Sequence, residues 1–210
     1  MTGVILKNQH TLPADKVIVA TGGCSYASTG STGDGYEFAK EAGHTVTAIR
    51  PGLTGIVTAD NIGKQLQGLT LKNCQVSIRR ESGKQKSLYE GFGEVLFTHY
   101  GVSGPLMLSA SSIIGDKLQK EPLILHIDLK PALTNEQLDK RIVKDFSERM
   151  NLSLKNACSN LLPASMVTEV LSRAGLDSDS KVNQLDKKNR LKLVDSIKDF
   201  TVTLKGLREI

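Results

Sequence analysis

One segment, residues 16–43, constrains the fold more than any other because it is rich in Gly, Ser and Thr. It opens with an apolar run at residues 17–20, which predicts a buried strand. Residues 21–23, Thr-Gly-Gly, follow at the strand end where open α/β sheets gather ligands. A helix is predicted at residues 36–42, with a natural C-terminal cap at Gly43. The loop between them either places N–H groups and hydroxyls around an anion or is a tight turn without a ligand.

Short strand-like runs dominate the rest of the first 130 residues. Residues 3–7 and 16–20 predict two strands joined by a loop that contains Pro13 and Asp15. After residues 50–52 the runs become closely spaced, which is typical of a sheet folded on itself, a barrel or a sandwich. The predicted strands there are residues 53–58, 74–80, 86–90, 94–98 and 123–129, with Gly83 in a turn between two of them.

From residue 131 the pattern becomes helical, and three helices with short connections predict a small cluster. Thr134 and Gln137 have the spacing of a capping box at the start of the first helix, and residues 165–174 predict the second. Residues 200–204 return to strand alternation. The apolar faces of the first and third helices are Leu138, Ile142 and Phe146, and Leu191, Val194 and Ile197, respectively.

The charge balance permits only a weak attraction to anions. The net charge is +5, but much of the excess lies in residues 181–198, where interspersed acids indicate a solvated helix face. Aromatic residues make up 4% of the chain and Trp is absent, which argues against an aromatic stacking platform for single-stranded nucleic acid. We therefore expect no nucleic-acid partner.

The cysteines indicate a reducing compartment. Cys24, Cys74 and Cys158 form no CxxC motif and fit no zinc spacing, so no metal site is expected. Cys24 follows two glycines, and a small buried thiol is favoured there over a redox centre. No apolar run is long enough to span a membrane, and residues 1–10 lack the regions of a signal peptide. We expect a cytoplasmic protein without a membrane partner.

Three segments together resemble one family of enzymes. They are ATGGCSYASTGSTGDGYEFAKEAGHTVTAIRPGL, EVLFTHYGVSGPLMLSAS and DFTVTLKGLREI, which lie along essentially the whole chain. They resemble the BaiN-like, or aminoacetone-oxidase-type, group of NAD(P)/FAD-dependent oxidoreductases. In that family an FAD-binding domain of Rossmann type is interrupted by a long insert with a β-barrel-like part and a helical part.

The expected fold class is therefore α+β, a β-barrel-like domain with a small helical subdomain, plus a remnant of an α/β Rossmann-type FAD-binding domain. The expected division is residues 1–45 for the remnant, 46–130 for the barrel, 131–198 for the helices and 199–210 for a returning strand. No GxGxxG motif, the usual dinucleotide-binding turn, occurs in the sequence. The resemblance then implies a fragment, whose partner is the remainder of the FAD-binding domain.

The resemblance implies that the loop of residues 21–35 packs against FAD. Its glycines would permit close backbone approach, and its hydroxyls would donate hydrogen bonds. Asp34 has an alternative role, which the pattern favours, as the cap of a helix that starts near Tyr36. The implied cofactor-binding residues are Thr21, Gly22, Gly23, Thr29, Gly30, Ser31, Thr32, Gly33, Asp34 and Gly35.

His99 and Ser103 are the candidate catalytic residues. Both lie in residues 97–105, FTHYGVSGP, a polar and Gly-rich stretch that follows an apolar strand. A histidine titrates near neutrality, so His99 suits the proton that accompanies hydride transfer, and its alternative role is structural. Residues 104–105, Gly-Pro, are typical of a helix start, for which Ser103 is a plausible N-cap.

The sequence thus predicts a fragment of a flavoprotein oxidoreductase that binds FAD and uses NADH or NADPH. The chain would contribute part of the FAD loop and the insert that covers the active site, and would be inactive alone. Flavin enzymes leave the difficult chemistry to the cofactor, so the substrate does not follow from these residues. The alternative is a non-catalytic, stand-alone β-plus-helical module that acts through protein or ligand contacts.

Overall fold

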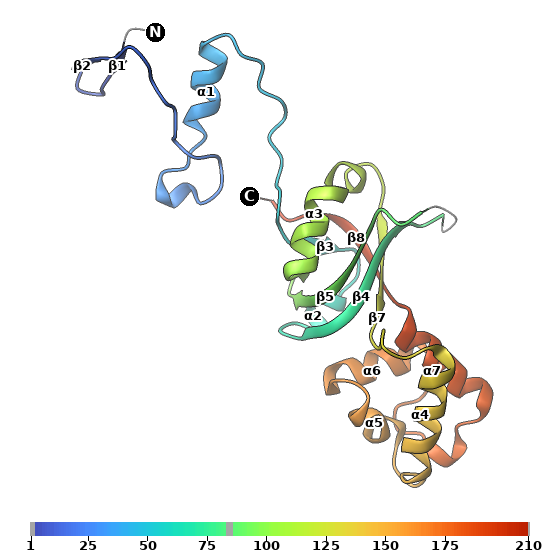
Figure 1. The fold of residues 1–210 in the computed structure, drawn as a ribbon. Coiled ribbons are helices and arrows are strands. Elements are labelled where there is room, and N and C mark those ends of the chain that lie inside the picture. Colours follow the sequence, from blue (N-terminus) through green and yellow to red (C-terminus); the bar gives the residue numbers. More distant parts are fainter. Residues whose placement is uncertain (1–2, 83–85, 210) are drawn as a thin grey trace. The chain divides into compact units, whose positions relative to one another are not determined.

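The structure is a computed structural model that describes residues 3–82 and 86–209 (Figure 1). The chain divides into two compact units, one that ends at Arg50 and one of Pro51–Glu209. The predicted turn at Gly83 lies outside the described residues.

In the first unit, strand β1 (Gly3–Ile5) pairs antiparallel with β2 (Thr11–Pro13). A 3₁₀ turn, η1 (Ala27–Thr29), and helix α1 (Asp34–Glu41) follow. The predicted strands at residues 3–7 and 16–20 are wrong in extent and in position, respectively. The first ends early because the chain reverses at residues 6–10, and residues 16–20 have no strand partner within the described part of the chain.

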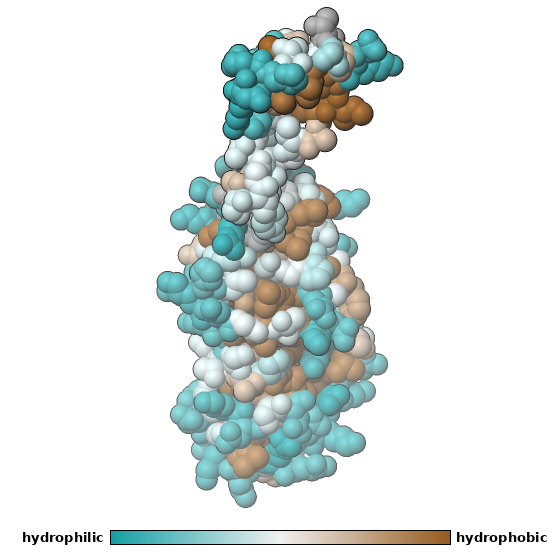
Figure 2. Space-filling model, turned by 90° about the vertical axis from the view of Figure 1, so that its left-hand side faces the viewer, coloured by the Kyte–Doolittle hydropathy of each residue, from teal (hydrophilic) through white to brown (hydrophobic). Residues whose placement is uncertain are grey.

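The first unit has no apolar core of its own. Within residues 3–50 no apolar side chain is buried, and the exposed fractions of Ile18, Val19 and Phe38 are 91%, 50% and 48%. Figure 2 shows hydrophobic surface gathered on this unit. Apolar side chains stabilise a fold only when they leave water, so this unit gains little from burial.

The second unit is built on a closed antiparallel barrel, which confirms the predicted barrel-like fold (Figure 1). Strand β3 pairs with both β6 and β8, so the sheet has no free edge. The strands in their order around the barrel are β3 (Ile56–Thr58), β6 (Gly101–Ser103), β5 (Tyr89–Thr98), β4 (Thr70–Arg80), β7 (Leu123–Asp128) and β8 (Phe200–Leu207).

The barrel strands differ from the predicted runs mainly at their ends. The predicted strand 53–58 begins only at Ile56, and the runs 86–90 and 94–98 belong to one strand, β5. In β7, buried Leu123, Leu125 and Ile127 alternate with half-buried residues, as expected for a barrel wall. Two helices accompany the barrel, α2 (Ile62–Gln65) and α3 (Pro105–Leu118), and α3 packs on β5, β6 and β8.

The predicted helical cluster is present between β7 and β8. Its elements are α4 (Asn135–Ser147), α5 (Leu154–Ala157), η2 (Cys158–Asn160), α6 (Ala164–Arg173), η3 (Val182–Gln184) and α7 (Lys187–Lys198). The capping box of Thr134 and Gln137 is confirmed by both of its hydrogen bonds, at 3.2 and 2.9 Å. On α7 the buried residues are Leu193, Val194 and Ile197, whereas the predicted Leu191 is 41% exposed.

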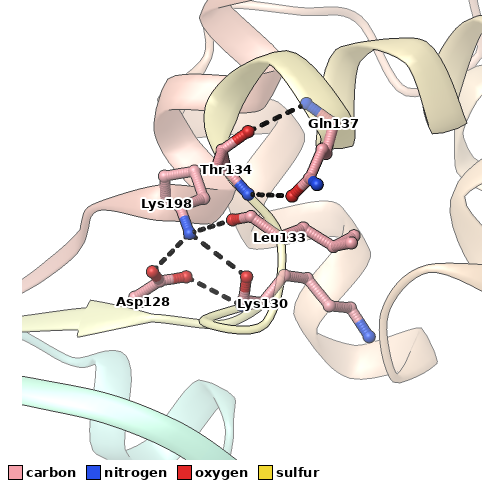
Figure 3. A network of polar contacts seen from close by, with 6 residues as sticks. All are labelled: Asp128, Lys130, Leu133, Thr134, Gln137 and Lys198. Atoms are coloured by element: carbon pink, nitrogen blue, oxygen red, sulfur yellow. Dashed lines mark hydrogen bonds and ion pairs between the residues drawn. The ribbon is translucent and has the colours of Figure 1, made fainter.

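One side chain, Lys198, joins the helical cluster to the barrel (Figure 3). Its ammonium lies 2.5 Å from Asp128 Oδ2 and donates to the carbonyls of Lys130 and Leu133, at 3.1 and 2.6 Å. Asp128 Oδ1 in turn accepts the Lys130 N–H at 2.9 Å. The Lys198 side chain is only 14% exposed. One residue at the end of α7 therefore fixes the end of β7 and the loop that leads to α4.

We expect Lys198→Met to lower the free energy of unfolding by about 1.5–3 kcal/mol, the range for hydrogen bonds to charged groups. The variant leaves the Asp128 carboxylate largely buried without its cation. Chemical denaturation of the chain measures the change. Lys192→Met on the same helix is the control, because its ammonium bonds Asn189 at the surface, and its effect should stay within about 0.5 kcal/mol. Equal losses in both variants would contradict the role of Lys198.

Candidate functional site

The Gly-rich loop of residues 21–35 closes on itself before α1. Gly30 ends η1, and its N–H donates to the carbonyl of Ala27 at 3.1 Å. Gly33 is the N-cap of α1 at φ +90°, a left-handed conformation that favours glycine. A Cβ at Gly33 would also lie 3.0 Å from Cys24 Sγ. This turn starts α1 at Asp34, two residues before the predicted start.

Two predicted cofactor hydroxyls are bonded within the loop. Thr29 Oγ1 donates to the carbonyl of Tyr26 at 2.7 Å, and Thr32 Oγ1 donates to Asp34 Oδ1 at 2.9 Å. The favoured role of Asp34 as the helix cap is therefore wrong, because Gly33 is the N-cap and no side chain caps α1. Asp34 instead ties the loop to the first turn of the helix.

The loop brings four of the predicted residues close together. A Cβ at Gly22 would lie 2.6 Å from Ser31 Oγ, and a Cβ at Gly35 would lie 2.8 Å from Thr21 Oγ1. The two glycines thus leave room for these two hydroxyls.

Several backbone N–H groups of this loop have no acceptor. Within the described residues, the N–H groups of Gly22, Gly23, Ser31 and Gly33 donate to no protein atom. Free N–H groups around a helix start suit phosphate oxygens or ring carbonyls. The loop therefore fits an anionic, hydrogen-bonding cofactor such as FAD.

An apolar cavity lies beside the loop within the same unit. Its volume is about 630 Å³, and residues of β1, residues 17–21 and Phe38 line it. Apolar cavities with a few polar groups are typical of cofactor sites. Residues 17–19, expected as a buried strand, are part of this lining instead.

The predicted catalytic stretch forms a tight hairpin in the second unit. Thr98 pairs with Gly101, so His99 and Tyr100 are its two loop residues. Helix α2 packs directly on this hairpin, since a Cβ at Gly63 would lie 2.6 Å from Gly101 N and from Thr98 O. The turn is therefore held by backbone packing.

Tyr100 has the more reactive surroundings of the two loop residues. The Arg208 guanidinium carbon lies 4.7 Å from the centre of the Tyr100 ring. Burial raises the pKa of Tyr100, but hydrogen bonding and the positive charge of Arg208 outweigh it, so the pKa is lower than usual. The Tyr100 hydroxyl also lies against Gly55, where a Cβ would clash with it. This arrangement favours loss of the phenolic proton.

His99 and Ser103 have less activated surroundings. The His99 side chain is exposed, and its ring meets the Tyr100 ring edge-on with centres 5.1 Å apart. Ser103 is in β6, and Gly104 is the N-cap of α3, so Ser103 is not the predicted cap. The sequence reasoning missed Tyr100, which is adjacent to His99, because its partner Arg208 is far away along the chain.

Buried thiols and possible metal ligands lie apart from these residues. Burial raises the pKa of Cys74 to about 11 and that of Cys158 to about 12, whereas Cys24 is half-buried in the Gly-rich loop. Among the described residues no group of His, Cys, Asp and Glu could hold a metal ion. In the same part of the chain, every helix is too short or too polar to cross a membrane.

We expect Gly63→Ala to destabilise the second unit by about 1–3 kcal/mol, the usual range for overpacking. The added methyl group meets backbone atoms of the hairpin, which have no flexible end to move aside. Thermal unfolding measures the loss. Gly206→Ala in β8 is the matched control, because nothing lies within 4 Å of its Cβ. If both variants melt alike, α2 does not hold the hairpin.

Comparisons with known proteins give the family and three relatives. The family model of the HI0933-like protein barrel and H2TH domain matches residues 50–210. A ribosomal RNA dihydrouridine synthase of Escherichia coli K12 is 30% identical over 201 residues, which are 95% of this chain and 46% of that protein. The enzyme of that name from Haemophilus influenzae is 30% identical over 203 residues, 97% and 47% of the two chains.

A 3-dehydro-bile acid delta(4,6)-reductase of Clostridium scindens is 23% identical over 202 residues, 96% of this chain and 48% of that protein. The chain thus spans about half the length of the curated relatives that it matches.

Proposed function

The chain belongs to the HI0933-like barrel and H2TH family of flavoprotein oxidoreductases, and we propose that it forms part of an FAD-dependent reductase of uridine in RNA. Two relatives that are 30% identical along nearly all of this chain are named for dihydrouridine in ribosomal RNA, which supports this substrate. The observation that carries the reaction type is the Tyr100–Arg208 pair on the hairpin.

The names of the relatives share one kind of chemistry. Dihydrouridine is uridine with one hydrogen added to each carbon of a ring double bond that is conjugated to a carbonyl. A 3-dehydro bile acid with delta(4,6) double bonds is likewise a conjugated ketone. Each reduction needs a hydride at one carbon and a proton at its neighbour. When bound, FAD supplies the hydride, and NADH or NADPH restores it to the reduced form.

The first unit supplies contacts for FAD in this proposal. The free N–H groups of Gly22, Gly23, Ser31 and Gly33 donate to the oxygens or ring atoms of the cofactor. The apolar cavity beside them excludes water from an aromatic ring. The remaining predicted contacts, Thr21, Thr29, Gly30, Thr32, Asp34 and Gly35, shape the loop around these donors. The rest of the FAD-binding domain is the partner that completes the cofactor site.

The second unit supplies the proton. The Tyr100 phenol donates its O–H proton to the substrate carbon that becomes negative when the hydride adds to its neighbour. The Arg208 guanidinium then stabilises the phenolate that remains. His99, exposed at the same hairpin, exchanges protons between Tyr100 and water. Ser103 orients this hairpin from β6.

We expect Tyr100→Phe to lower turnover of the full-length protein by roughly a hundredfold to ten-thousandfold, the usual value of a general acid. Flavin content and melting temperature should stay unchanged, because only the hydroxyl is lost. Consumption of reduced nicotinamide with an oligouridylate substrate measures turnover. His99→Gln is the comparison variant, and its effect should be smaller. A larger loss in His99→Gln would identify the histidine as the acid instead.

Arg208 should set the alkaline limit of activity. A tyrosine acid works only while protonated, so the rate falls as the pH rises through its pKa. Arg208→Gln removes the charge that lowers the pKa of Tyr100, so the falling limb should move to higher pH. A limb that stays in place would show that Tyr100 is not the titrating acid.

Cys24 provides a test of the cofactor loop that does not depend on activity. It is half-buried against Gly33, so it should react with iodoacetamide before the buried Cys74 and Cys158 do. In the full-length protein, FAD should slow alkylation of Cys24 by about tenfold or more, as read by peptide mass. Labelling that ignores FAD would contradict a cofactor site at this loop. A full-length protein without the visible absorbance of flavin would favour the non-catalytic module.

A further inference from the structure

A groove of about 650 Å³ lies in the second unit, apart from the hairpin of Tyr100. Strands β4 and β5 form one wall, and the loop from β7 to α4 together with Arg141 of α4 forms the other. The described residues that line the groove include three cations and no acid. The cations are Lys72, Lys130 and Arg141.

Two of these cations crowd each other. Burial and the positive charge of Arg141 together lower the pKa of Lys130. Figure 3 shows the Lys130 side chain pointing away from the Asp128–Lys198 pair, so that carboxylate does not neutralise it. The nearest printed acid to Arg141 is Asp145, at 3.4 Å, and Arg141 remains 53% exposed. Like charges held close together gain free energy when an anion binds between them.

The groove also carries a large exposed aromatic ring. Phe92 is 61% exposed, although it lies in the middle of β5. It pairs directly with Gln75 of β4, so both side chains are on the outer face of the barrel. Asn73 adds a second amide at the irregularity between β4 and β5. A ring flanked by two amides can stack on a base and hydrogen-bond to its edge.

We propose that this groove binds single-stranded or looped RNA, with Phe92 stacked on a base and Lys72, Lys130 and Arg141 on the phosphates. The inference rests on the proposed function for the purpose of the bound RNA, but binding itself needs no flavin. An acidic peptide would match the charges and leave the exposed ring and the two amides unexplained. RNA accounts for all of them.

This proposal departs from the expectation that the composition supports. The chain has few aromatic residues, and much of its excess charge lies in residues 181–198. The groove uses one aromatic residue and three cations that are distant in sequence and meet only through the barrel and α4.

Fluorescence anisotropy of a labelled single-stranded oligouridylate with the full-length protein tests the proposal. Lys72→Gln/Arg141→Gln should weaken binding by about tenfold and reduce the salt slope by about two, one for each lost phosphate contact. The matched control is Lys155→Gln/Lys188→Gln, which removes the same charge from exposed positions on α5 and α7 and should change little. Equal effects of the two double variants would overturn the proposal.

Phe92→Ala separates base stacking from simple attraction. It should weaken oligouridylate binding by about tenfold without changing the salt slope or the melting temperature, because the ring is exposed. Heparin, a polyanion without bases, should bind the variant and the parent alike. Unchanged RNA affinity in Phe92→Ala, or polyglutamate that competes as well as RNA, would overturn the proposal.

The flavin absorbance of the same preparations separates the two proposals. Weak RNA binding by a yellow protein would reject the groove and leave the reductase intact. Groove-dependent RNA binding by a protein that never holds flavin would support the groove and reject the reductase.

Discussion

The buried ammonium of Lys198 is the contact on which the arrangement of the second unit depends. It ties the last residue of α7 to Asp128 and to two carbonyls of the loop that leaves β7. That loop forms one wall of the RNA groove, and Lys198 precedes β8, which closes the barrel and leads to Arg208. A cation with little access to water must keep all of these acceptors, so the groove wall and the barrel closure are set together.

Much of the second unit could be predicted from its sequence because its signals are local. The capping box at Thr134, the alternation of residues 123–128 and the apolar face of α4 each depend on neighbours in the chain. The strand at residues 16–20 was wrong because an apolar run becomes a strand only with a partner to pair with. Helix α3 was missed beyond its start, because its apolar residues are nearly continuous and give no clear period.

The candidate sites were less predictable because they depend on contacts between distant residues. The hairpin was found through its Gly-rich composition, but Tyr100 gains its lowered pKa from Arg208, which lies in the last residues of the chain. In the loop, Asp34 was assigned to a helix cap, and the backbone gave that position to Gly33. The groove gathers Lys72, Phe92 and Arg141 from three different elements, and no spacing in the sequence brings them together.

The account states that this chain is part of a protein that reduces uridine in RNA. The most direct test is the mass of the nucleosides from RNA that has been incubated with the full-length protein, FAD and reduced nicotinamide. We predict a uridine that is heavier by two hydrogens and that disappears when Tyr100 is replaced by Phe. RNA of unchanged mass, from a protein that holds flavin and oxidises the nicotinamide, would contradict the account.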